Sequence, residues 1–318
     1  MHIPRRTTDN TTGRLASNTS SKPSGNTARV IVGGLARNPT EEGEIGRMST
    51  IYAVANQKGG VGKTTTAINI AATAAADGAK VLLVDVDPQF AATRQVGVSY
   101  GDLPLTIVDV LARDVPAANV IIHDVHGFDV LPARRDLKDV ALALVQALGR
   151  ESVLRLALDP LADEYDAIVI DTPPDLGLLT VNALVAADVV VAPVSAEDEG
   201  AAQGVLELRA TLHQVVDRLR AGKPIRLVTL MTRWSDDRAQ AGDMSDALAG
   251  ADISVAARVK LRVDVQKAAG RRTPFVLQHD RAARDAADQL QDFARELVAG
   301  DATAQVIGDA TENTEAAA

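Results

Sequence analysis

Short apolar runs alternate with longer stretches of helical periodicity along most of this chain. The apolar runs are rich in Val and Ile, which is typical of strands that are buried on both faces. They lie at 51–55, 80–84, 167–170, 188–192 and 225–231. Helical stretches lie at 64–76, 137–148, 177–186, 202–220 and 283–298. This alternation predicts an α/β fold, a mostly parallel twisted sheet flanked by helices on both faces, in which ligands bind at the carboxyl ends of the strands.

The two ends of the chain lack this alternation. Residues 1–47 are rich in Thr, Ser, Asn, Gly and Arg, and we interpret them as a disordered tail or as a segment upstream of a true translation start at Met48. Residues 301–318 are acidic and predict a second disordered tail. The folded domain is therefore expected over 48–300.

A glycine-rich loop follows the first apolar run. Residues 58–65 read Lys-Gly-Gly-Val-Gly-Lys-Thr-Thr. Glycines let backbone N–H groups converge on phosphate oxygens, and the helix that begins near Gly62 adds the positive end of its dipole. The pattern predicts a nucleotide-phosphate cradle formed by Gly59, Gly60, Val61, Gly62, Lys63, Thr64 and Thr65. In such a loop Lys63 reaches the β- and γ-phosphates and the Thr64 hydroxyl binds Mg²⁺.

The head of this loop departs from the common phosphate-binding pattern. That pattern has a glycine five residues before its Gly-Lys pair, and here the position is occupied by Gln57. A second lysine, Lys58, comes directly after it. The plain alternative for Lys58 is an ordinary solvated lysine in a Gly-rich turn. The variant with Gln57 and Lys58 at its head is narrower than the general motif, and the place of Lys58 in this variant favours a functional role.

Acidic residues follow two later apolar runs. Asp85 and Asp87 come after the run that ends at Val84, and Asp171 comes after the run 167–170. Acids just past buried parallel strands lie at the same sheet edge as the phosphate loop, where they can hold the water ligands of Mg²⁺ or orient an attacking water. One such acid is a weak signal, because many strands end in a capping Asp. Two such positions beside a phosphate loop indicate nucleotide hydrolysis.

Four blocks of sequence make the chain similar to a known family. They are 55–66 (Ala-Asn-Gln-Lys-Gly-Gly-Val-Gly-Lys-Thr-Thr-Thr), 83–89 (Leu-Val-Asp-Val-Asp-Pro-Gln), 170–184 (beginning Ile-Asp-Thr-Pro-Pro) and 191–194 (Val-Ala-Pro-Val). Through these blocks the chain resembles the ParA/MinD group of deviant Walker A ATPases, and most of all the ParA-type partition ATPases, over roughly 50–298. It departs from the family pattern at Phe90 and Ala91, where Gly and Asn are frequent, and at Asp175, where Ser is frequent.

The resemblance implies ATP and Mg²⁺ as ligands and gives the loop residues specific roles. Lys58 would be the signature lysine, which reaches across an ATP-sandwich homodimer to the phosphates of the partner. Lys63 would act within its own chain. Thr64 would coordinate Mg²⁺, and Thr65 would bond the α-phosphate.

The resemblance also implies roles for the acids. Asp87 would position the hydrolytic water, Asp85 would support the metal region, and Asp171 would hold a Mg²⁺-bound water. The expected catalytic residues of an ATPase are then Lys58, Lys63 and Asp87. Catalysis of this kind rests on positioning and charge neutralisation, so turnover should be slow until a dimer and a partner complete the site.

Positive charge is concentrated in two places, although the formal net charge of the chain is −9. The later group comprises Arg258, Lys260, Arg262, Lys267, Arg271 and Arg272. The earlier group comprises Arg209, Arg218, Arg220, Lys223 and Arg226. Such groups can contact DNA phosphates without reading bases, whereas a charge run is also often just a solvated face. The resemblance favours nonspecific DNA binding by the later group.

Two further pairs of residues carry weaker expectations. His123 and His126 hint at a metal site, but without a third ligand we expect an ordinary loop with solvated histidines. Thr232 and Arg233 directly follow the run 225–231, and their position suggests the border of an adenine site.

The expected function is that of a cytoplasmic, nucleoid-associated ATPase for plasmid or chromosome partition, stimulated by a ParB-like centromere-binding adaptor. The alternative is a ParA-like or MinD-like ATPase that positions a protein cluster or a membrane-associated cargo. The acidic C-terminus lacks a basic amphipathic helix, which argues against membrane binding. The chain contains no cysteine, which excludes thiolate metal sites and cysteine nucleophiles within it. No feature of the sequence indicates a metabolic ATP-dependent synthetase.

Overall fold

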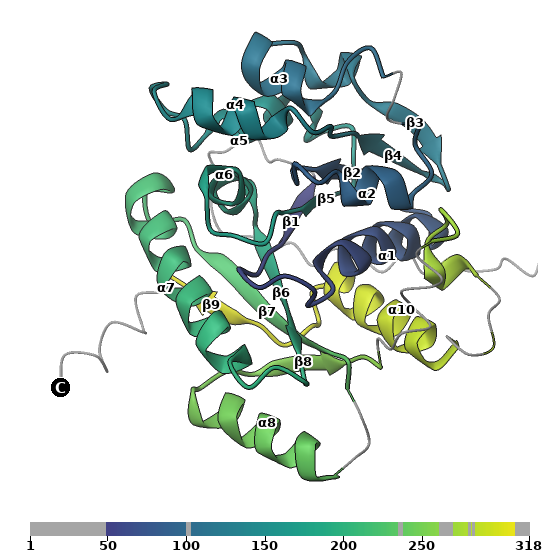
Figure 1. The fold of residues 1–318 in the computed structure, drawn as a ribbon, viewed down its shortest axis with the longest axis vertical. Helices are drawn as coiled ribbons and strands as arrows, with labels where there is room; N and C mark the ends of the chain where they lie inside the picture. Colours follow the sequence, from purple (N-terminus) through teal and green to yellow (C-terminus); the bar gives the residue numbers. More distant parts are fainter. Residues whose placement is uncertain are drawn as a thin grey trace, which may run out of the picture. The chain divides into compact units, whose positions relative to one another are not determined.

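A nine-stranded sheet forms the centre of the part of the chain that the computed structural model describes, namely residues 49–99, 103–234, 238–260, 270–278, 281 and 284–308 (Figure 1). The strand order is β3-β4-β2-β5-β1-β6-β7-β8, and β9 also pairs with β7. The strands are β1 (Thr50–Val54), β2 (Val81–Asp85), β3 (Ile122–Val125), β4 (Phe128–Leu131), β5 (Ala167–Asp171), β6 (Val189–Ser195), β7 (Ile225–Thr232), β8 (Val255–Arg258) and β9 (Gln305–Ile307). All pairings are parallel except β3 with β4 and β7 with β9.

Helices cover both faces of this sheet, which confirms the predicted fold class (Figure 1). They are α1 (Lys63–Ala76), α2 (Ala91–Gln95), α3 (Ile107–Arg113), α4 (Leu137–Leu144), α5 (Val153–Leu158), α6 (Leu178–Ala186), α7 (Ala201–Leu219), α8 (Arg238–Gly250) and α10 (Arg284–Ala299). Side chains of α3 to α8 belong to one hydrophobic core, and those of α1, α2 and α10 belong to the other.

Strand β1 shows why the central runs are continuously apolar. Successive side chains of a strand point to opposite faces of the sheet. Ile51 and Ala53 therefore lie in the core under α3 to α8, while Tyr52 and Val54 lie in the core under α1 and α10. All four are at most 2% exposed, so both faces select apolar residues.

The structure differs from the sequence prediction mainly at the sheet edges. The hairpin of β3 and β4 was expected to be a loop around His123 and His126, yet His123 lies on β3. Its Nδ1 is 2.8 Å from Asp129 Oδ2 on β4. Among the described residues no group of three or more His, Cys, Asp or Glu is arranged to hold a metal ion. His126 Nε2 lies 3.0 Å from the Val96 carbonyl oxygen, so each histidine contacts a neighbouring part of the fold.

The C-terminal segment also differs from the expected disordered tail over 301–318. Residues 305–307 form β9, which pairs antiparallel with β7. Ile307 is fully buried, and the Arg226 guanidinium donates hydrogen bonds to the carbonyls of Gly300 and Ala302. The strand was missed because three residues are too few to show a period. Residues 1–48 and 309–318 lie outside the described part of the chain.

Candidate functional site

The phosphate loop connects the carboxyl end of β1 to the first turn of α1. Gly60 and Gly62 adopt φ angles of +76° and +97°, a region that favours glycine. Gly62 is the N-cap residue of α1, and no side chain caps this end of the helix. The first N–H groups of α1 are therefore available to an anion, and the helix dipole adds to the attraction.

Lys63 lies in the first turn of α1, with only 7% of its surface exposed. Its Nζ donates a hydrogen bond of 2.8 Å to the Lys58 carbonyl oxygen. Burial lowers the pKa of Lys63, and the nearby Asp171 and Asp87 carboxylates oppose this shift. The structure thus brings together the lysine and two acids that are far apart in the sequence.

Asp85 and Asp171 are neighbours because β2 pairs with β5 in a register that sets them opposite each other. Both are fully buried. Asp85 accepts hydrogen bonds from the Thr93 N–H and hydroxyl at 2.8 and 2.7 Å, and from the Asp87 N–H at 3.1 Å. Burial raises the pKa of Asp85 to about 6. Asp85 therefore orders the chain that follows β2 and fixes the backbone of Asp87.

Asp171 has fewer partners. The Thr64 hydroxyl is the one hydrogen-bonding group that lowers its pKa, and its two carboxylate oxygens lack a well-formed hydrogen bond within the described residues. Burial raises its pKa well above the ordinary value, and the charge of Asp85 adds to the shift. An unsatisfied buried carboxylate beside a phosphate loop suits a hydrated divalent cation, because the positive charge would offset the cost of burial.

Asp87 lies at the mouth of the site and is 7% exposed. Its Oδ1 accepts a 2.8 Å hydrogen bond from the Gln89 N–H. Burial raises its pKa, while the Gln89 hydrogen bond and the Lys63 charge lower it. The carboxylate is thus held in place by its own turn and faces the charged lysine of the phosphate loop.

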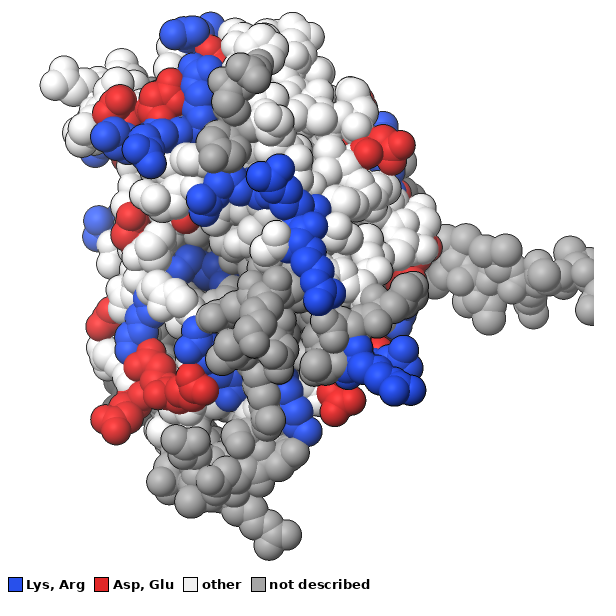
Figure 2. Space-filling model, turned by 45° about the vertical axis from the view of Figure 1, so that its right-hand side comes forward, with Lys and Arg blue, Asp and Glu red and all other residues white. Residues whose placement is uncertain are grey.

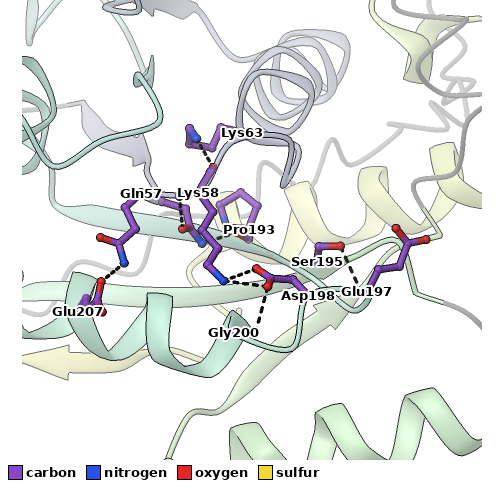
Figure 3. Close-up of polar contacts among 10 residues, drawn as sticks. Gln57, Lys58, Lys63, Pro193, Ser195, Glu197, Asp198, Gly200 and Glu207 are labelled. Atoms are coloured by element: carbon purple, nitrogen blue, oxygen red, sulfur yellow. Dashed lines mark hydrogen bonds and ion pairs between the residues drawn. The ribbon is translucent and has the colours of Figure 1, made fainter.

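The head of the loop is tied to the start of α7 (Figure 3). Asn56 donates a 2.8 Å hydrogen bond to the Pro193 carbonyl, and its Oδ1 accepts one from the Lys58 N–H at 3.0 Å. Gln57, at the position where common loops have glycine, donates to Glu207 Oε2. The Lys58 ammonium forms an ion pair with Asp198 at 2.7 Å. Sequence reasoning missed Asp198, because no local pattern marks it as a partner of a lysine 140 residues away.

The end of β7 supports the loop from the other side. The Thr232 hydroxyl lies 2.9 Å from the Val61 carbonyl, and Arg233 Nη2 donates to the Gly60 carbonyl at 2.9 Å. Arg233 Nη1 also contacts Glu197 at 3.1 Å. These two residues, expected near the adenine, contact the phosphate loop itself. Their position after a central strand was the only signal in the sequence.

The later basic group is partly described. Figure 2 shows Lys and Arg side chains gathered in several groups on one face. The Arg258 guanidinium lies 5.1 Å from the Trp234 ring centroid, and the Lys260 N–H donates to Gln289 of α10. Arg271 and Arg272 lie next to each other in the segment before residues 275–277, whereas Arg262 and Lys267 fall outside the described residues.

The earlier basic group has structural partners. Arg209 contacts the Asp252 carbonyl and Gln305, and Arg220 donates to the carbonyls of Val185 and Ala187. The Arg220 side chain is only 6% exposed. Arg209 and Arg220 are thus engaged in contacts within the fold, whereas Arg218 and Lys223 of the same group are exposed.

Comparison with known proteins agrees with this geometry. Residues 49–223 match a family model described as an AAA domain, which is more than half of the chain. The chain is 41% identical over 214 residues to the chromosome partitioning protein ParA of Myxococcus xanthus, which covers 66% of this chain and 73% of that protein. It is 44% identical over 173 residues to a Pseudomonas putida protein, covering 54% of this chain and 65% of that one.

Solved structures give the same architecture. A structure from Mycobacterium smegmatis, described as cobyrinic acid a,c-diamide synthase with bound ATP analog and magnesium, is 31% identical and superposes with a TM-score of 0.68. The similarity covers 79% of this chain and 94% of that one. The deviant phosphate loop, the paired acids at the sheet edge and the similarity to partition proteins all agree. The chain belongs to the ParA-type partition ATPases of the ParA/MinD group.

Proposed function

We propose that this chain is a DNA-partitioning ATPase that binds ATP with Mg²⁺, dimerises on ATP and binds nonspecific DNA. Hydrolysis is stimulated by a ParB-like centromere-binding adaptor, and the protein works in the cytoplasm on the nucleoid. The observation that carries the proposal is the buried Lys63, held between the phosphate loop and the Asp87 and Asp171 carboxylates.

The chain's own residues supply binding and orientation. The loop amides and Lys63 hold the phosphates, and Thr64 with Asp171 would hold Mg²⁺, the latter through water. The bound Mg²⁺ supplies charge neutralisation at the β- and γ-phosphates. Asp87 orients the attacking water, since its carboxylate is fixed by Asp85 through the backbone and by Gln89. Asp85 itself has a positioning role, because its oxygens serve Thr93 and Asp87.

Lys58 acts on the second subunit of an ATP-sandwich homodimer. Its position at the head of the loop, outside the cradle that Lys63 completes, supports this division of roles. Hydrolysis then requires two copies of the chain, which links turnover to assembly. A dimer also doubles the DNA-binding surface, so weak contacts gain by multivalency and binding depends on nucleotide.

DNA binding is assigned to the later basic group, of which Arg258, Lys260, Arg271 and Arg272 are described. Contacts to phosphates are independent of base sequence and weaken as salt increases. No described helix is long and apolar enough to cross a membrane. A ParA-like or MinD-like ATPase that positions a protein cluster or a membrane-associated cargo stays as the alternative function.

A synthetase function has one observation in its favour, the 31% identity to the M. smegmatis structure. An amide synthetase that draws ammonia from glutamine through a thiolate would need a cysteine, and this chain has none. We therefore place partition first. Nucleotide-dependent retention on DNA separates the two functions, since a synthetase has no need of it.

The test is binding to a nonspecific DNA duplex with ATP, with ADP and without nucleotide. We expect ATP-dependent, salt-sensitive binding, and its loss in the Arg271→Glu/Arg272→Glu variant with ATP affinity retained. Arg135→Glu/Lys138→Glu is the matched control, because it reverses two exposed charges at the start of α4, over the opposite face of the sheet. DNA affinity that is equal in all nucleotide states would contradict the proposal.

A further inference from the structure

The Lys58 ammonium is held by an acid of its own chain. Its Nζ lies 2.8 Å from Asp198 Oδ1 and 2.7 Å from Asp198 Oδ2 (Figure 3). The Lys58 and Asp198 side chains are 35% and 28% exposed, so the pair is neither sealed nor fully solvated. The hydrogen bond from Lys58 lowers the pKa of the Asp198 carboxyl. The Asp198 carboxyl is therefore ionised at neutral pH, and the partly exposed pair can exchange with solvent.

Asp198 is fixed at the start of α7. Its Oδ1 accepts a 3.0 Å hydrogen bond from the Gly200 N–H, and its carbonyl accepts one from the Ala201 N–H at 2.9 Å. Its own N–H donates to the carbonyl of Ser195, the last residue of β6. The carboxylate is thus preorganised on a strand-to-helix turn and does not depend on Lys58 for its position.

Two glycines of this region leave room for the lysine. A Cβ added at Gly200 would overlap Lys58 Nζ, whereas one added at Gly204 would meet Lys58 Cε at 4.0 Å, an ordinary contact. The φ of Gly200 is −94°, which any residue can adopt. Glycine at position 200 is therefore required by the space that the Lys58 ammonium occupies and not by the backbone conformation.

We propose that Asp198 is the resting acceptor of Lys58, from which the lysine must be released before it can serve the ATP of a second copy of this chain. The inference rests on the proposed function, in which Lys58 acts across the dimer. The Asp198 carboxylate and the phosphates of the partner therefore compete for the same ammonium. Asp198 is thus a positioning residue that sets the protein concentration at which the ATP dimer forms.

The expected change in the dimer dissociation constant follows from the exposure of the Lys58–Asp198 pair. A half-exposed ion pair shifts an equilibrium by about two- to fivefold, and forming one dimer releases two such pairs. Removing the acceptor should therefore lower the dimer dissociation constant by roughly four- to twenty-five-fold. The difference from wild type should shrink at high salt, because salt screens the ion pair.

Asp198→Asn is the direct test, because the Asn oxygen can still accept the Gly200 N–H while the charge is lost. Dimerisation of the full chain is measured by sedimentation with Mg²⁺ and a nonhydrolysable ATP analogue over a range of protein concentrations. Glu199→Gln is the matched control, since it removes the same charge at the next, exposed position. We expect tighter dimers for Asp198→Asn and wild-type behaviour for Glu199→Gln.

Gly200→Ala provides a second test that leaves both partners intact. Its methyl group should push the lysine head off Asp198 and so strengthen the dimer as Asp198→Asn does. Gly204→Ala adds the same methyl group four residues later on α7, without this overlap, and should match wild type.

The outcomes separate this inference from the function on which it rests. If wild type dimerises with the analogue and Asp198→Asn and Gly200→Ala dimerise no more tightly, the acceptor role is overturned while the proposed function stands. If the wild-type chain itself stays monomeric with the analogue, the proposed dimer is overturned and this inference with it.

Discussion

Asn69 and Val276 are joined by a buried hydrogen bond between segments that are 207 residues apart. The Val276 N–H donates to Asn69 Oδ1 at 3.1 Å. The same Asn69 side chain donates through Nδ2 to the Thr65 carbonyl at 2.7 Å. Asn69 thus connects the first turn of α1, beside the phosphate loop, to the short 3₁₀ helix Phe275–Leu277, which follows Arg271 and Arg272.

Asn69→Ala should lower the free energy of unfolding by about 1–3 kcal/mol, because it leaves the buried Val276 N–H without an acceptor. Urea denaturation of the nucleotide-free protein measures this. Thr73→Val, one turn along α1, is the control. The buried Thr73 hydroxyl has no hydrogen-bond partner among the residues that the structure describes, so its removal should be neutral or stabilising. Equal destabilisation by both changes would contradict the role assigned to Asn69.

Lys58→Ala should leave ATP binding largely intact and abolish dimer-dependent hydrolysis. The reason is that Lys63, not Lys58, completes the cradle within the chain. Nucleotide affinity by calorimetry and ATP turnover in the presence of DNA and adaptor are the two measurements. Loss of all nucleotide binding would show that Lys58 serves its own loop and would remove the cross-subunit role.

Asp87→Ala should bind ATP and remain dimeric on DNA, because the water-orienting carboxylate is lost while the cradle is kept. Dissociation from DNA after ATP addition should be slowed about a hundredfold or more, the lower end of what a general base contributes. Asp163→Ala, an exposed acid far along the chain, serves as control. Normal ATP hydrolysis by Asp87→Ala would contradict the assignment of Asp87 as the residue that orients the attacking water.

The Asp171 and Asp85 carboxyls predict a specific pH dependence. Burial raises both pKa values, to about 6 for Asp85 and well above the ordinary value for Asp171. As pH rises above about 4, the unfolded chain loses these protons first. The free energy of unfolding of the nucleotide-free protein should therefore fall with rising pH until the folded-state pKa values are passed. Asp171→Asn should flatten this slope in denaturation experiments.

Binding of ATP with Mg²⁺ should show the opposite trend. A cation favours the ionised Asp171, so binding releases a proton and strengthens as pH rises through the same window. Proton uptake or release can be measured by calorimetry in buffers of different ionisation enthalpy. If Asp171→Asn and wild type release the same number of protons, Asp171 does not face the metal.

Local patterns were sufficient for the central strands and for the loop. β1, β2, β5, β6 and β7 were predicted within a few residues, because strands buried on both faces must be apolar throughout. The edge elements, such as β9, were missed, since a three-residue strand is defined by its pairing with β7 and not by its own composition.

The sequence by itself determined that the chain makes a phosphate loop with a second lysine at its head and acids after two strands. These features are local, because glycine, lysine and aspartate carry their conformational and chemical preferences with them. Only the tertiary structure decided their partners. The pairing of β2 with β5 set Asp85 against Asp171, and the turn after β6 brought Asp198 to Lys58.

The same reason separates the two basic groups. In the sequence the two groups looked alike. In the fold the Arg220 guanidinium donates to main-chain carbonyls and its side chain is only 6% exposed, whereas Arg271 is exposed. A charge in a sequence has no partner until the fold supplies one, and burial decides whether it is structural. Residue types and spacing therefore determined the chemistry of this protein, and strand order and packing decided which groups that chemistry joins.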